Sequence, residues 1–137
     1  MAGLLIVTHA NFAGELLRAA EMIVGPISCA ETVSISREDS VEQIVQTLGD
    51  ACATVARDQG GVIVMTDMFG GTPTNLSLTL VDHYEIEIVT GVNLPMVLKF
   101  VHCREMPLKE LALALRDYAA DKISVVSEML ESQGRGG

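Results

Sequence analysis

The stretch GVIVMTDMFGGTPTN, residues 61–75, decides the fold. Its first six residues, 61–66, form a short apolar run rich in β-branched side chains, which predicts a strand buried on both faces. The run ends abruptly at Asp67, and two glycines lead to Thr72 and Pro73, which predict the N-terminus of a helix. A buried strand followed by a tight turn and a helix is the repeating unit of a parallel α/β sheet.

The same alternation of strand and helix extends outward in both directions. Further strands are expected over residues 3–8, 29–36, 84–89 and 123–129, and helices over 12–24, 73–81, 93–102 and 107–120. Asp39, followed three residues later by Glu42, is expected to cap the helix after the second strand. The sequence therefore predicts a three-layer α/β/α fold with a doubly wound, mainly parallel sheet in the order 2-1-3-4.

Length and composition limit the classes of protein that remain. The chain has 137 residues, which predicts one domain, over residues 1–130, followed by a disordered C-terminal tail over residues 131–137. The longest unbroken apolar run is only about five residues, far below the ~20 that a membrane-spanning helix needs. Neither a signal peptide nor membrane insertion is expected, and three widely spaced cysteines favour a cytoplasmic protein without disulfides or a zinc site.

Charge is distributed unevenly along the chain. Nine Lys and Arg against eighteen Asp and Glu give a net charge of −9. Residues 1–98 account for all of it, because their only cations are Arg18, Arg37 and Arg57, against twelve acids. Such a surface disfavours nucleic acids and anionic membranes and suits a basic protein partner.

Two polar residues lie where this topology places a ligand site. His9 comes directly after the first strand and Asp67 directly after the third. Since the strand order reverses between these two strands, we expect the two side chains to meet at the carboxyl edge of the sheet. A histidine held by a carboxylate keeps one tautomer and leaves its other ring nitrogen free as a nucleophile or base.

The turn after Asp67 is suited to holding an anion. Backbone N–H groups of Gly70, Gly71 and Thr72, at the start of a helix, can bind phosphate. Asn93, in the turn after the fourth strand, is a candidate for the wall of the same cleft, although a plain helix cap would explain it equally well. The loop is neither a Walker A motif nor GxGxxG, so nucleotide binding is not expected. No metal site, cofactor or Gly-x-Ser-x-Gly elbow is predicted.

Four stretches together resemble one known family. They are LLIVTH (4–9), FAGELLRAAE (12–21), VMTDMFGGTPTN (64–75) and TGVNLPM (90–96). In this order and spacing they are similar to the IIA domain of the mannose/fructose/sorbose-family phosphoenolpyruvate-dependent sugar phosphotransferase system, over residues 3–130.

The resemblance implies a phosphocarrier. His9 would be the phosphorylated residue and Asp67 its support, with HPr as phosphoryl donor and a IIB protein as acceptor. It also implies a homodimer, with Ile123–Met129 as an antiparallel strand at the sheet edge. Ala10 departs from the family, which usually has glycine after the histidine. Two related functions stay open, a regulatory phosphoprotein without transport output and the phosphocarrier subunit of a dihydroxyacetone kinase; a flavodoxin-like binding domain is a further alternative.

Overall fold

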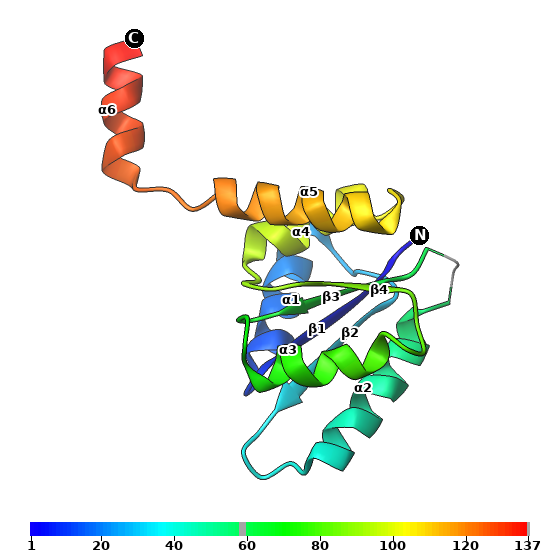
Figure 1. Ribbon diagram of the computed structural model, residues 1–137. Helices are drawn as coiled ribbons and strands as arrows, with labels where there is room; N and C mark the ends of the chain where they lie inside the picture. The colour runs from blue at the N-terminus through cyan, green and yellow to red at the C-terminus, as the bar shows by residue number, and fades with distance from the viewer. Residues whose placement is uncertain (58–59, 137) are drawn as a thin grey trace.

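A four-stranded, fully parallel sheet forms the centre of the protein. The computed structural model describes residues 1–57 and 60–136. The strands are β1 (Gly3–His9), β2 (Ala30–Ile35), β3 (Val62–Thr66) and β4 (Ile86–Val89), in the order β2-β1-β3-β4. Figure 1 shows β1 and β3 side by side in the middle of the sheet. The predicted strand order for these four strands is thus confirmed.

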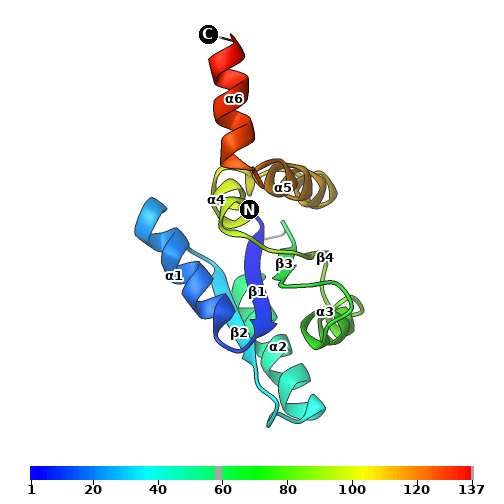
Figure 2. The same ribbon diagram turned by 90° about the vertical axis from the view of Figure 1, so that its left-hand side faces the viewer.

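Helices cover both faces of the sheet. One face carries α1 (Phe12–Val24), α4 (Leu94–Cys103) and α5 (Leu108–Asp121), whose apolar side chains share one core cluster with Leu4, Ile6, Ile63 and Met65. The other face carries α2 (Val41–Val55) and the 3-10 turn η1 (Leu78–Leu80), packed on Leu5, Val7, Val62 and Val64. The short helix α3 (Thr72–Ser77) lies on this second face, against β1 and beside α2 (Figure 2). The predicted three-layer α/β/α class is confirmed.

Alternation along β1 explains why the strand is buried on both faces. Leu4 and Ile6 point to one layer of helices, and Leu5 and Val7 point to the other. All four side chains are fully buried. Central parallel strands with both faces covered carry continuous apolar runs of this kind.

The start of α2 differs from the prediction by one residue. Ser40, not Asp39, is the N-cap: its hydroxyl accepts a hydrogen bond from the Gln43 N–H, and the Gln43 side chain accepts one from the Ser40 N–H. This reciprocal pair is a capping box. Asp39 instead accepts a hydrogen bond from the Ser36 N–H and closes the turn before the cap.

The C-terminal segment is a helix and not a strand. Residues Val126–Gly136 form α6, so the predicted antiparallel edge strand over Ile123–Met129 is wrong for this chain, and the sheet has four strands in the described residues. The helix also runs through most of the segment for which we predicted a disordered tail; of that segment, only residue 137 lies outside the described residues. α6 projects from the body (Figure 1). A helix satisfies its own backbone hydrogen bonds, whereas an edge strand requires a neighbouring chain segment.

No helix in the part of the chain that the structure describes is long and apolar enough to cross a membrane.

Candidate functional site

His9 and Asp67 meet at the carboxyl ends of β1 and β3. In the register of these strands Val7 pairs with Thr66, so the residues that follow are brought to the same edge of the sheet. The Asp67 Oδ2 atom lies 2.7 Å from His9 Nδ1. The same oxygen accepts a hydrogen bond from the backbone N–H of His9 at 2.9 Å. His9 and Asp67, which are 58 residues apart in the sequence, are thus in direct contact, as the predicted topology requires.

The ionisation of Asp67 fixes the tautomer of His9. Desolvation raises the pKa of the Asp67 carboxyl, but its hydrogen bonds to His9 and the charge of the ring outweigh that effect and hold the pKa below its ordinary value of 3.8. An ionised carboxylate has no proton to donate, so the hydrogen of the 2.7 Å contact belongs to Nδ1. The neutral ring then keeps its lone pair on Nε2.

The two side chains differ in their access to solvent. The His9 side chain is 52% exposed, while that of Asp67 is 14% exposed. The second carboxylate oxygen, Asp67 Oδ1, is buried and has no hydrogen-bond partner in the described residues. A large partner can therefore reach the imidazole, but it cannot replace the carboxylate behind it.

The glycine turn lies directly against the imidazole ring. A Cβ atom at Gly71 would be 3.1 Å from His9 Cε1, and Gly70 has φ +83°, a conformation that side chains disfavour. The N–H groups of Gly70 and Gly71 donate no hydrogen bond of good geometry within the described residues. α3 begins at Thr72. The residues predicted to hold phosphate are therefore placed beside the ring, with unpaired backbone donors.

Three buried threonines, Thr8, Thr66 and Thr74, which sequence reasoning did not single out, hold the turns after β1 and β3. The hydroxyl of Thr8 accepts a hydrogen bond from the Ala13 N–H at 2.7 Å. Thr74 Oγ1 lies 2.7 Å from Thr66 Oγ1 and donates to the carbonyl of Met68 at 2.7 Å. The only available signal was a polar residue at the last buried position of each strand.

A cavity of about 620 Å³ opens beside His9. It is lined by His9, Ala10 and Thr72 and by residues from the end of β2, the β2–α2 connection and α2: Ile35, Ser36, Arg37, Asp39, Val41 and Ile44. Ala10 has φ +50°, in the left-handed region. The main chain turns sharply there, directly after the candidate nucleophile.

Asn93 does not share this cavity. Its Oδ1 accepts a hydrogen bond from the Met96 N–H at 3.0 Å, and its Nδ2 donates to the Ala119 carbonyl at 3.1 Å. The side chain therefore caps α4 and fastens it to α5. It lines a different, smaller cavity of about 160 Å³.

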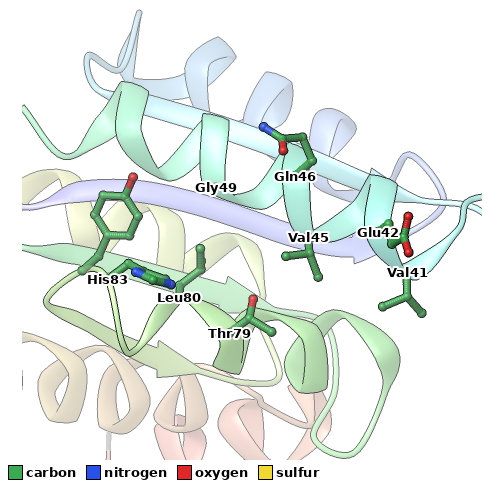
Figure 3. A pocket seen from close by; sticks show the side chains of 9 residues that line it. Val41, Glu42, Val45, Gln46, Gly49, Thr79, Leu80 and His83 are labelled. Carbon is green, nitrogen blue, oxygen red and sulfur yellow. The ribbon is translucent and has the colours of Figure 1, made fainter.

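A second large cavity lies between α2 and η1 and measures about 670 Å³ (Figure 3). Val41 lines both this cavity and the one beside His9. Its other walls include Val45, Leu80 and His83. It contains neither the His9–Asp67 pair nor the glycine turn, so its greater size does not make it the reactive site. No group of three or more His, Cys, Asp or Glu residues in the described ranges could hold a metal ion.

Comparison with known proteins agrees with this geometry. A family model described as the PTS system fructose IIA component (EIIA-man) matches residues 3–114. The chain belongs to this family. As a IIA component of the phosphotransferase system, it is 26% identical over 133 residues to the fructose-specific EIIA component of Bacillus subtilis, covering 96% of this chain and 90% of that protein.

Other members of the family share part or all of this IIA component. The mannose-specific EIIAB component of Escherichia coli K12 is 28% identical over 103 residues, which are 74% of this chain and 32% of that protein. The chain thus matches about a third of that relative. The crystal structure of phosphotransferase system component EIIA from Streptococcus agalactiae superposes with a TM-score of 0.82 at 26% identity, covering 93% of this chain and 99% of that one.

Proposed function

We propose that this IIA component is a histidine phosphocarrier that accepts a phosphoryl group from HPr on His9 and passes it to a IIB protein for sugar uptake. One observation carries the proposal: Asp67 holds Nδ1 of His9 at 2.7 Å, on an imidazole ring that is about half exposed. Family membership supports a role in the phosphotransferase system.

The pair suits in-line phosphoryl transfer. Nε2 of neutral His9 attacks the phosphorus of a phosphohistidine on HPr, and the new N–P bond forms as the N–P bond of the donor breaks. The His9 ring gains positive charge in this step, while its Nδ1 proton stays hydrogen-bonded to Asp67. The adjacent carboxylate stabilises that charge.

The transferred group carries negative charge on its three equatorial oxygens. The free N–H groups of Gly70 and Gly71, together with Thr72, lie in the turn beside the imidazole, since a Cβ atom on Gly71 would be only 3.1 Å from His9 Cε1. In the proposal these groups bind the equatorial oxygens. Donors fixed in place before the reaction lower its barrier without further reorganisation.

Partners and assembly form the remaining part of the proposal. The acidic surface of residues 1–98 suits a basic carrier docking over His9. A IIB protein receives the phosphoryl group in the cytoplasm. The outer edge of β4 is unpaired in the described chain, and a homodimer would cover such an edge.

Intact-mass measurement tests the proposal directly. After incubation with phosphoenolpyruvate, Enzyme I and HPr, the wild-type protein gains the mass of one acid-labile phosphate. His9→Ala gains none, whereas His83→Ala and His102→Ala, which remove the other two histidines, gain one each. Phosphate on His9→Ala, or none on the wild type, would refute it. Transfer onward to a purified IIB protein separates a transport component from a regulatory phosphoprotein.

A further inference from the structure

Arg37 is the only cationic side chain in the cavity beside His9. The cavity is lined by nine residues, of which Arg37 alone is a lysine or arginine. It lies in the short connection between β2 and α2, whereas His9 ends β1. Both residues line the same cavity because β1 pairs with β2: His9 pairs with Ile35, the last residue of β2, and Arg37 follows two residues later.

Acidic groups lie around this cavity, and Arg37 is the single cation among the residues that line it. Asp39 also lines the cavity, and Asp67 lies behind His9. A phosphoryl group on Nε2 would add further negative charge to residues 1–98, in which acids already outnumber cations by twelve to three. Backbone N–H groups supply only partial charges, so a full positive charge in the same cavity has a large effect.

The connection that carries Arg37 is fixed at both ends. The Ser36 N–H donates to Asp39 Oδ2 at 2.9 Å, and the Asp39 N–H donates to the Ser36 carbonyl at 3.3 Å. Ser40 then begins α2 with its capping box. Because Asp39 is engaged with the backbone of Ser36, the turn presents Arg37 at its tip.

The guanidinium group is available for a ligand. Within residues 1–57 and 60–136, the Arg37 side chain is exposed and makes no hydrogen bond or ion pair with another residue. By contrast, Arg18 pairs with Glu15 at 2.8 Å, and the Arg57 side chain donates to the carbonyl of Thr54. Of the three cations in residues 1–98, Arg37 alone has no such partner.

We propose that Arg37 binds the phosphoryl group carried by His9 and so stabilises the phosphorylated form of the protein. This inference rests on the proposed function. A guanidinium presents a planar fork of N–H donors that matches two phosphoryl oxygens, and such charge-assisted pairs are about twice as strong as neutral ones. Arg37 takes part in no bond-making step; it binds the phosphoryl group while His9 carries it.

The position of the transfer equilibrium tests this role. Phosphorylated HPr is mixed with the unphosphorylated protein until the ratio of the two phosphoproteins no longer changes, and both are quantified by intact mass. We expect Arg37→Ala to lower the equilibrium constant about tenfold relative to wild type, at the lower end of what a hydrogen bond to a charged group contributes. Arg37→Lys restores part of the loss, because it keeps the charge without the fork.

Arg57→Ala is the matched control, since it removes the same charge from the same acidic region at a residue outside the cavity. Its equilibrium constant stays within about twofold of wild type. Equal constants for Arg37→Ala and Arg57→Ala overturn the proposal. This holds even if Arg37→Ala reacts more slowly, because a docking contact with HPr changes both rates and leaves the equilibrium unchanged.

A second measurement decides the role of Arg37 even if the proposed function fails. If the wild-type protein takes up no phosphate, inorganic phosphate is titrated at fixed pH while the His9 Cε1–H resonance is followed by NMR. A saturable shift in wild type and Arg57→Ala, absent in Arg37→Ala, supports Arg37 as the anion ligand of this cavity. The same shift in all three proteins, or in none, overturns it.

Discussion

Two turns at the carboxyl edge of the sheet look alike in sequence but use their polar side chains differently. The β3–α3 turn begins with Asp67 and the β4–α4 turn contains Asn93, and both lead to a helix with proline in its first turn. Asp67 makes its hydrogen bonds to His9, in the adjacent strand. Asn93 makes both of its hydrogen bonds to helices, at Met96 and Ala119.

The difference follows from strand order. β3 adjoins β1, so a side chain at its carboxyl end meets the end of another central strand. β4 lies at the edge, with β3 as its only neighbour in the described residues, and its turn packs beneath α5. A polar residue that leaves a sheet at a reversal of strand order therefore meets the end of another central strand, whereas one beside an edge strand stabilises a helix.

Asp67→Ala gives the largest expected effect. We expect phosphorylation of His9 to slow roughly 10- to 100-fold, since hydrogen bonds to charged groups contribute ~1.5–3 kcal/mol. Folding persists, because the substitution also removes the buried, unpartnered Oδ1 atom. Stopped-time mass spectrometry measures the rate. Asp82→Ala, an equal charge change at an exposed residue before β4, serves as control, and equal rates for the two variants would contradict the assigned role.

Asn93→Ala is expected to lower stability and leave the rate of phosphorylation nearly unchanged, the opposite of Asp67→Ala. Losing the α4 cap and the bond to Ala119 lowers the free energy of unfolding by about 1–2 kcal/mol, while the rate of phosphorylation stays within about twofold of wild type. Urea denaturation supplies the first quantity. Asn93→Ser retains a capping oxygen and recovers part of the stability. A large loss of rate without loss of stability would contradict the capping role and indicate that Asn93 belongs to the reactive site.

Ala10→Gly concerns a third turn at the same edge, between β1 and α1. With φ at +50°, Ala10 is in a conformation that costs an L-residue ~1–2 kcal/mol, part of which is offset by the greater backbone entropy of unfolded glycine. We expect stabilisation by about 0.5–1 kcal/mol in urea denaturation. Ala56→Gly, at φ −83°, relieves no strain and should not stabilise. Equal shifts for both variants would refute the strain argument.

Gly71→Ala has the smallest expected effect. The added Cβ would lie 3.1 Å from His9 Cε1 and 3.2 Å from Met68 Cγ, so the imidazole must shift by a few tenths of an ångström. Phosphorylation slows about threefold, in line with the ~0.5–1.5 kcal/mol cost of an off-rotamer side chain. Gly49→Ala, whose Cβ meets nothing within 4 Å, leaves the rate unchanged. No difference between them would show that the ring tolerates the contact.

The sequence alone was sufficient to predict the two central strands of the sheet and the contact at their ends. Apolar runs that end at His9 and Asp67 fix β1 and β3, and the reversal of strand order between them predicts their contact. This works because both strands are buried on both faces, where composition alone distinguishes strand from loop.

The parts that the sequence mispredicted, left open or did not reveal depend on weaker signals. The β-branched residues of Ile123–Met129 favoured a strand, yet an edge strand needs a partner and the helical spacing of Val126, Met129 and Leu130 prevailed. Asn93 lies two residues before Pro95, a proline in the first turn of α4, and this position fits a helix cap as well as a cleft wall. For Arg37, the sequence showed a rare cation but gave no sign that it shares a cavity with His9.

The central position of β1 has a consequence for how the protein folds. Of the four strands, β1 leaves the ribosome first, and both of its neighbours, β2 and β3, are synthesised later. β2 closes the shorter loop onto β1, and β3 closes the longer one, which carries the larger entropic cost. Acquisition of the His9–Asp67 contact during refolding therefore reports on β3 docking specifically, and it should lag behind helix formation in α1 and α2.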